Sequence, residues 1–224
     1  MKLLIVIPVY NEEQSIKKVL TEWIFQLNKF NFYYNILVIN DGSTDQTKKI
    51  LKDLNDKKIK IINNKNIGHG KSCVCGYKYS IKKTFTHVLQ IDSDGQCDPK
   101  FFFSLYKNIN KFPVIYGYRK IRDDGILRKY FSRIMEIFIF FKTFKFIKDP
   151  NTPYRLIETK ILKEILKKVP KNIILANVYL TFEIYKKYKI FYVPIRFRKR
   201  YFGRSKYNLQ SMLKSFANLL INLK

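Results

Sequence analysis

Val88-Leu-Gln-Ile-Asp-Ser-Asp-Gly-Gln96 is an apolar run that ends abruptly in two carboxylates, Asp92 and Asp94. Side chains alternate between faces along an extended chain, so these carboxylates, spaced i and i+2, are expected to project to the same side. At the open end of a sheet, such a pair can hold a divalent cation against a phosphate-bearing ligand. Asp-Ser-Asp-Gly is also ordinary turn chemistry, and the motif alone favours a solvated turn slightly over a metal site.

The first half of the chain alternates short apolar runs with amphipathic segments. Strands are predicted at residues 3–7, 34–39, 58–62, 86–91 and 113–117, and helices at 12–28, up to about 54, 70–83 and 99–110. Asn11 is the expected N-cap of the first helix, and Ser43 or Thr44 that of the second. This order is typical of an α/β fold with a Rossmann-like, mostly parallel twisted sheet and helices on both faces.

Three polar loops follow predicted strands, at residues 8–12, 40–45 and 92–96. The carboxyl ends of parallel strands meet at one edge of a sheet, and ligands bind just outside that edge. The three loops are therefore expected to lie together. Their coincidence reverses the first preference and favours an active site over three unrelated turns.

The second half of the chain is less regular. Helices are predicted at 127–147, 160–168, 176–188 and 205–223, a loop at 149–155 and a strand at 190–196. No repeat, linker or domain boundary interrupts the 224 residues, so one domain is expected. No stretch reaches the ~18 uncharged apolar residues of a membrane span, because charged residues interrupt the nearest one, at 130–147.

The formal charge is +27, from 44 Lys and Arg against 17 Asp and Glu. Such a charge indicates an acidic partner: nucleic acid, an anionic membrane surface or phosphorylated small molecules. A sequence-wide excess of lysine explains the charge equally well, so the arginines carry more weight.

Cys73, Cys75 and Cys97 lack paired spacing, which disfavours a zinc site with His69 or His87. The apolar N-terminal stretch is too short for a signal peptide. Together with the three cysteines, it indicates a reducing cytoplasm in which the thiols are free.

Four short motifs occur in order along the chain: Pro8-Val-Tyr-Asn-Glu12, Asn40-Asp-Gly-Ser-Thr-Asp45, Asn66-Ile-Gly-His-Gly70 and Asp92-Ser-Asp94. They resemble the inverting glycosyltransferases of family 2, which have the single-domain GT-A fold. Two later segments, Asp149-Pro-Asn-Thr-Pro-Tyr-Arg155 and Arg200-Tyr-Phe-Gly203-Arg-Ser205-Lys206, resemble the dolichol-phosphate mannose synthase-like, polyprenyl-phosphate branch of that family. Each motif is weak singly, whereas the ordered set, spanning roughly residues 1–210, is specific.

The resemblance implies a role for each motif. Residues up to about 118 would bind a UDP- or GDP-sugar, and 119–224 would bind the acceptor. Asp94 and Gln96 would ligate Mg²⁺ or Mn²⁺, which would stabilise the diphosphate leaving group, while Asp92 would face the ribose or sugar. The base and ribose would lie on Pro8, Tyr10, Glu12 and Asp41. The family's usual Asp-Asp pair is Asn40-Asp41 here, which leaves the choice of nucleotide open.

Phosphate binding is assigned to arginines predicted to lie in loops, where their forked donors can clamp anionic oxygens. These cations are Arg119, Arg155, Arg200, Arg204 and Lys206. A sugar hydroxyl would need a general base, for which Asp149 is the best candidate, although a structural role is equally plausible. A lipid monophosphate needs none, since its second pKa is about 6. His69 is expected to be a loop residue rather than a ligand.

The aromatic helix at 127–147 and the closing helix at 205–223 are both amphipathic. A basic, Phe-rich helix of this kind can lie in a membrane interface, and a net positive surface adds attraction to anionic lipids. Packing of these helices against the core or in a homodimer explains the pattern equally well.

The leading hypothesis is a metal-dependent, inverting glycosyltransferase that acts on a polyprenyl phosphate at the cytoplasmic face of a membrane. The alternatives are transfer to a hydroxyl of a surface glycan or lipopolysaccharide and, remotely, a nucleic-acid-binding module. Carboxylates at the strand ends disfavour a nucleic-acid partner.

Overall fold

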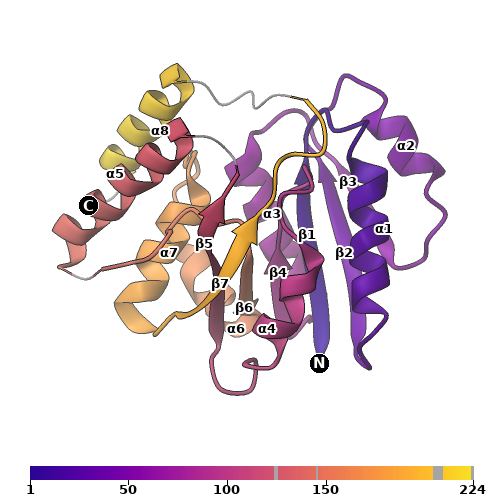
Figure 1. The fold of residues 1–224 in the computed structure, drawn as a ribbon, viewed down its shortest axis with the longest axis horizontal. Coiled ribbons are helices and arrows are strands. Elements are labelled where there is room, and N and C mark those ends of the chain that lie inside the picture. The colour runs from indigo at the N-terminus through magenta and orange to yellow at the C-terminus, as the bar shows by residue number, and fades with distance from the viewer. Residues whose placement is uncertain (124–125, 145, 204–208, 223–224) are drawn as a thin grey trace.

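The computed structural model describes residues 1–123, 126–144, 146–203 and 209–222. Within these ranges seven strands form one sheet in the order β3-β2-β1-β4-β6-β5-β7 (Figure 1). The strands are β1 (Lys2–Val9), β2 (Tyr33–Asn40), β3 (Ile59–Asn63), β4 (His87–Gln90), β5 (Val114–Arg122), β6 (Arg155–Glu158) and β7 (Phe191–Phe197). β6 pairs antiparallel with β4 and β5, and all other neighbouring strands are parallel. The mostly parallel α/β sheet predicted from the sequence is confirmed.

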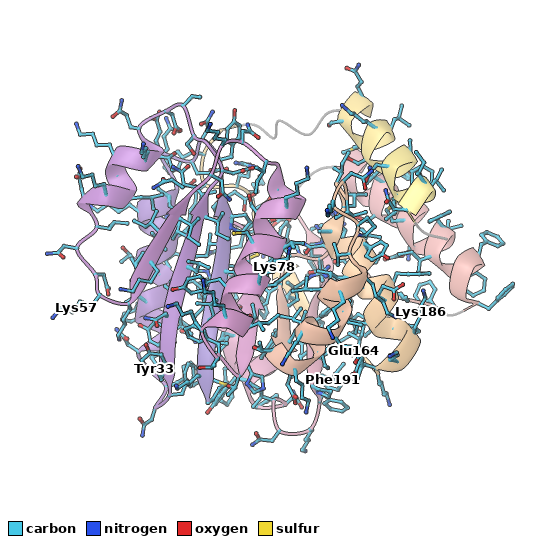
Figure 2. All side chains as sticks on the ribbon, turned by 180° about the vertical axis from the view of Figure 1, so that it is seen from behind. Tyr33, Lys57, Lys78, Glu164, Lys186 and Phe191 are labelled. Atoms are coloured by element: carbon cyan, nitrogen blue, oxygen red, sulfur yellow. The ribbon has the colours of Figure 1, made fainter. Side chains whose placement is uncertain are left out.

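Helices cover both faces of the sheet. They are α1 (Ile16–Leu27), α2 (Thr47–Asp53), α3 (His69–Lys82), α4 (Phe102–Tyr106), α5 (Ile126–Thr143), α6 (Thr159–Ile165), α7 (Ala176–Lys187) and α8 (Leu209–Asn222). Ile5 of β1 faces the layer that contains α1 and α4, and Val6 faces the layer that contains α3, α6 and α7. Both side chains are fully buried, which is why the strand reads as a continuous apolar run. Lys78 of α3 and Lys186 of α7 lie on the outer surface of the second layer (Figure 2).

The aromatic helix α5 packs beside the closing helix α8 (Figure 1). Met135 and Ile139 of α5 share a buried cluster with Leu219 of α8 and Val178 of α7. The rings of Phe138 and Phe216 meet edge-on, with centroids 5.4 Å apart. One face of α5 is therefore part of the core. None of the helices in the described ranges is both long and apolar enough to cross a membrane.

The first two helices begin later than predicted, because the loops before them bond to each other. Asn11 has φ of 54°, and its side-chain Oδ1 accepts the Thr44 backbone N–H at 2.8 Å. The Asn11 N–H in turn donates to Ser43 Oγ at 3.0 Å. These polar groups thus join the loops instead of capping helices, and the predicted caps are wrong. α1 starts at Ile16, and Asp45 Oδ1 accepts from Thr47 N at the start of α2.

The prediction also missed β6. This four-residue strand begins at the last residue of the predicted loop, 149–155, and fills the gap before the predicted helix at 160–168. It lies inside the sheet, between β4 and β5, and is antiparallel to both. Its shortness and its prolines upstream hide the apolar pattern. β5 is longer than predicted, continuing to Arg122. Residues 204–208, which were predicted to form a loop and the start of the closing helix, lie outside the described residues.

Candidate active site

The three polar loops lie at the carboxyl ends of β1, β2 and β4, which are neighbours in the sheet (Figure 1). Val9 at the end of β1 pairs with Asn40 at the end of β2, so the first two loops leave the sheet side by side. The backbone N–H of Glu12 reaches across to Thr47 Oγ1 at 2.9 Å. The expected juxtaposition is therefore present in the structure.

Asp41 ties the second loop to the start of α3. It is 4% exposed, and its two carboxylate oxygens accept the backbone N–H groups of Ile67 and Gly68, each at 2.8 Å. Gly68 has φ of 91°, a conformation that favours glycine and that turns its N–H toward this carboxylate. Asp41 thus shapes the Asn66–Gly70 segment. Its predicted role toward a nucleotide base stays a prediction.

Asp92 is held by a chain of polar side chains. Gln90 Nε2 donates to Asp92 Oδ1 at 3.3 Å, and Asn177 Nδ2 of α7 donates to Gln90 Oε1 at 3.1 Å. His69 Nε2 lies 3.1 Å from the same Asp92 oxygen. His69 was predicted to be a loop residue, but it is the first residue of α3. Only the packing of α3 beside β4 brings this imidazole to Asp92.

Asp94 is a buried carboxylate at 7% exposure. Burial and the neighbouring charge of Asp92 raise its pKa to about 6, against the opposing attraction of Arg200. Its Oδ1 accepts the Gln96 backbone N–H at 3.1 Å, and Arg200 Nη1 lies 3.3 Å from Oδ2. A carboxylate that resists ionisation in this way gains most from a cation placed against it.

Arg200 bridges two of the predicted site residues. Its guanidinium pairs with Asp94 and also with Glu12 of the first loop. Tyr201 anchors the same segment, because its hydroxyl donates to the Glu22 carboxylate of α1 at 2.6 Å. Arg200 therefore lies beside the carboxylates of the candidate site, and its predicted role toward an acceptor phosphate stays a prediction. Arg204 and Lys206, the other predicted phosphate ligands of this segment, lie outside the described residues.

The residues of the Asp92–Gln96 loop fit a hard divalent cation. Carboxylate and amide oxygens are the ligands that Mg²⁺ and Mn²⁺ prefer. Gln96 Nε2 donates to the Arg198 carbonyl at 2.9 Å, so Oε1 is the amide atom that a cation would contact. Among the described residues no group of three or more His, Cys, Asp or Glu could by itself enclose a metal ion. A bound substrate and water would have to complete the coordination.

Two pockets open at this edge of the sheet. One, of about 370 Å³, is lined by Tyr10, Glu12 and Arg200. The other, of about 550 Å³, has Asp92 and Gln96 on its wall. Tyr10 is 37% exposed, while Pro8 lies within β1 and is buried. Of the predicted donor residues, Tyr10 and Glu12 line the smaller pocket and Asp92 lines the larger one, whereas Pro8 and Asp41 are buried and line neither.

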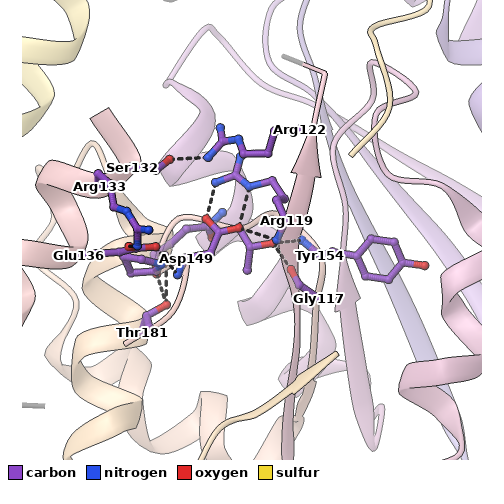
Figure 3. A network of polar contacts seen from close by, with 12 residues as sticks. Gly117, Arg119, Arg122, Ser132, Arg133, Glu136, Asp149, Tyr154 and Thr181 are labelled. Carbon is purple, nitrogen blue, oxygen red and sulfur yellow. Dashed lines mark hydrogen bonds and ion pairs between the residues drawn. The ribbon is translucent and has the colours of Figure 1, made fainter. Parts of the chain in front are cut away.

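The larger pocket is also lined by two arginines of β5, Arg119 and Arg122. Arg119 is not in a loop, as predicted, but within the strand, and it forms a two-pronged ion pair with Asp149 (Figure 3). Nε donates to Oδ2 at 2.7 Å and Nη2 to Oδ1 at 2.5 Å, and the Arg119 backbone N–H adds a third bond at 3.0 Å. Burial opposes ionisation of Asp149, but the Arg119 guanidinium outweighs it and holds the pKa of this carboxyl below its usual value.

Arg155 was predicted to bind an acceptor phosphate from a loop, and the structure contradicts this. It is the first residue of β6 and is fully buried. Its guanidinium donates to the carbonyls of Thr152, Pro150 and Asn177 at 2.7–2.9 Å. The donors of this guanidinium are thus used by backbone carbonyls of the protein itself. Arg122, which the sequence analysis did not single out, lines the pocket instead.

The sequence matches the family model of glycosyl transferase family 2 over residues 4–170. The chain belongs to this family. The enzyme is 25% identical over 224 residues to the undecaprenyl-phosphate 4-deoxy-4-formamido-L-arabinose transferase of Edwardsiella ictaluri, and 24% identical over 227 residues to that of Salmonella choleraesuis. These matches cover 96% and 98% of this chain and 66% of each relative. The glycosyltransferase thus spans just under two thirds of the length of the relatives that it matches.

Solved structures show the same fold. Glucosyl-3-phosphoglycerate synthase from Mycobacterium tuberculosis, in complex with Mn²⁺, UDP-glucose and phosphoglyceric acid, superposes with a TM-score of 0.74 at 15% identity. The match covers 99% of this enzyme and 79% of the synthase. The complex of that synthase with UDP gives a TM-score of 0.72 at 16% identity. The GT-A fold expected from the motifs is therefore confirmed.

Proposed function

We propose that this glycosyltransferase moves a hexose from a UDP- or GDP-sugar to a polyprenyl phosphate, with inversion and with the help of Mg²⁺ or Mn²⁺. The observation that carries the proposal is the composition of the larger pocket. Asp92 marks its donor side, Arg119 and Arg122 supply cationic groups, and Phe131 of α5 and Met212 of α8 form an apolar wall. An anionic head with an apolar chain matches this arrangement, and the names of the curated relatives point to the same acceptor class.

The donor would occupy the smaller pocket and the space toward Asp92. Glu12 and Tyr10 would contact the nucleoside, and Asp92, oriented by Gln90 and His69, would hold a ribose or sugar hydroxyl. A divalent cation bound by Asp94 and Gln96 would neutralise charge on the diphosphate as it leaves. The cation would compete with the Arg200 guanidinium for the Asp94 carboxylate. Arg200 would then release Asp94 and pair with another anionic group.

The acceptor chemistry follows from the state of Asp149. A hydroxyl acceptor needs a base that can take its proton. Asp149 already accepts three hydrogen bonds from Arg119 and has a lowered pKa, so it is a poor base. A phosphate monoester is anionic at neutral pH and needs no base. This supports a phosphate acceptor over a glycan hydroxyl.

The proposal is tested by direct transfer. Purified enzyme with Mn²⁺ and a panel of UDP- and GDP-sugars is expected to form a lipid-linked sugar with undecaprenyl or farnesyl phosphate, and EDTA is expected to stop the reaction. Thin-layer chromatography of radiolabelled product, with mass spectrometry, measures it. Transfer only to free polyprenol or to a soluble glycan, with no phosphate-linked product, would rule out the proposed acceptor.

We further propose that the enzyme docks on the cytoplasmic face of a membrane through α5 and α8. A stripe of large apolar side chains on α5 is exposed, at spacings of three and four residues: Tyr130, Ile134, Ile137 and Phe141. Leu213 and Ile221 of α8 are 61% and 70% exposed. The charge of +27 adds attraction to anionic headgroups. A lipid-borne acceptor would then reach the pocket between the same helices.

Phe141→Ser is expected to weaken binding to anionic vesicles by about tenfold, because a large apolar side chain no longer enters the interface. Flotation with phosphatidylglycerol-containing vesicles at low salt measures this. Phe25→Ser is the matched control, since Phe25 on α1 and Phe141 are both 68% exposed. Equal binding of the two variants would contradict the assigned face. A lipid-free dimer that Phe141→Ser dissociates in sedimentation would show instead that this face binds a second copy.

A further inference from the structure

Two side chains on the inner face of α5 reach the polar network around the pocket (Figure 3). Ser132 Oγ accepts from Arg122 Nη1 at 2.7 Å. Glu136 Oε1 accepts the backbone N–H of Asp149 at 3.0 Å, and Asp149 holds Arg119. Ser132 and Glu136 are spaced i and i+4, so they lie one above the other on a single helix face. α5 is thus connected to both arginines of the pocket.

An irregularity in β5 lets Arg119 and Arg122 act together. Residues three apart on a regular strand point to opposite faces of the sheet. Here the register against β7 shifts between Arg119 and Ile121, so that Arg119 lies opposite Ile195 and Arg122 opposite Phe197. Ile195 and Phe197 are two residues apart. Both arginines therefore line the same pocket, and their common direction depends on this bulge.

Asp149 needs support from outside its own segment. It has φ of 44°, a left-handed conformation that is uncommon for residues other than glycine. Glu136 fixes it by accepting its N–H, and Glu136 itself is only 9% exposed. Burying a carboxylate is costly unless it is paired. Its ionic partner Arg133 is on the same helix and has a side chain that is 65% exposed, so Glu136 is the member of the pair that points inward.

We propose that Glu136 is a positioning residue for the acceptor. Through Asp149 it sets the direction of the Arg119 guanidinium, and together with Ser132 it makes α5 the element that fixes the two-arginine face of the pocket. This rests on the proposed function only for the identity of the anion. These contacts also connect the two arginines to α5, the helix whose outer apolar stripe is exposed. A surface that binds α5 and fixes its position would therefore also fix the positions of the two arginines.

Three variants test the role of Glu136. Glu136→Ala removes the acceptor of the Asp149 N–H and is expected to raise the KM for farnesyl phosphate roughly tenfold or more, with the donor KM unchanged. Glu136→Gln keeps an amide oxygen in the same place and is expected to stay within about threefold of the wild type. Glu183→Ala is the matched control, because Glu183 is also a buried carboxylate paired with surface lysines, on α7. It should lower the melting temperature without changing the farnesyl phosphate KM.

Inorganic phosphate provides a reading that does not depend on the acceptor. Isothermal titration is expected to show that Glu136→Ala weakens phosphate binding roughly tenfold, whereas Glu136→Gln and Glu183→Ala do not. Unchanged phosphate binding and unchanged KM in Glu136→Ala would overturn the positioning role, as would equal losses in Glu136→Ala and Glu183→Ala. The wild type could fail to glycosylate farnesyl phosphate while the phosphate affinities of the three variants still differ as expected. That result would refute the proposed acceptor but not the positioning role of Glu136.

Discussion

Asp94→Asn is expected to reduce sugar transfer by about 10³-fold in kcat/KM, which corresponds to about 4 kcal/mol of transition-state stabilisation. The substitution removes a carboxylate charge but keeps the size of the side chain. In the proposed site this carboxylate holds the cation that neutralises the leaving diphosphate. An asparagine oxygen binds a divalent cation weakly, so the loss should appear at every donor concentration.

The stability of the same variant should change in the opposite direction. The folded-state pKa of Asp94 is raised to about 6, so the fold favours its neutral form. The stability contributed by that neutral form is full below the unfolded pKa of about 3.9 and is lost as the pH rises through about 6. Asparagine is neutral at every pH. Without metal, Asp94→Asn is therefore expected to melt at the same or a higher temperature than the wild type at pH 7.5.

Thermal unfolding with and without Mn²⁺ and UDP separates the loss of metal binding in Asp94→Asn from its effect on stability. The ligands should raise the melting temperature of the wild type at pH 7.5 and less so well below pH 6, and should not raise that of Asp94→Asn. Asp98→Asn is the control, since Asp98 is similarly buried, follows in the same loop and caps a short helix through the Lys100 N–H. A fully active Asp94→Asn variant would refute the metal assignment.

Arg155→Ala is expected to cost about 4 kcal/mol or more of unfolding free energy, because it strands several buried hydrogen-bond acceptors and leaves a cavity. Arg155 is fully buried, and its guanidinium joins the carbonyls of Thr152, Pro150 and Asn177. It also lies 4.6 Å from the centre of the Tyr116 ring. For a chain of this length the loss corresponds to a fall of roughly 10 °C in melting temperature.

Chemical denaturation measures the effect, and Arg155→Lys keeps the experiment informative if the alanine variant does not fold. Lysine should recover only part of the stability, since one ammonium cannot replace the forked donors. Arg196→Ala is the control: that arginine is exposed and paired with Asp123, so its loss should cost less than about 1 kcal/mol. A stable Arg155→Lys variant with a selectively raised acceptor KM would instead restore the predicted phosphate role.

Local sequence pattern was sufficient to bring together the three loops of the proposed donor side. Loops that follow parallel strands must meet at one edge, so the Pro8–Glu12, Asn40–Asp45 and Asp92–Gln96 segments could be brought together from strand order alone. The start of α1 was mispredicted, because Asn11 bonds to Thr44 across the loops instead of capping its own helix.

The proposed acceptor side depended on contacts between residues far apart in the chain. Arg155 has a loop-like sequence environment, yet its acceptors include the Asn177 carbonyl of α7, 22 residues away. Arg122 could not be grouped with Arg119 from the sequence, because their shared direction requires the bulge in β5. Nothing near Glu136 indicated that it would hold Asp149, 13 residues away.

The sequence by itself thus determined the fold class, the edge of the sheet that carries the site and the carboxylates there, because alternation and strand order are local properties. Only the tertiary structure decided which arginines line the pocket and which one is buried. It also decided that Asp149 pairs with Arg119 and that Arg200 occupies Asp94. Charge and residue type are visible in the sequence, but the ionic partner of a side chain is selected by how distant elements pack.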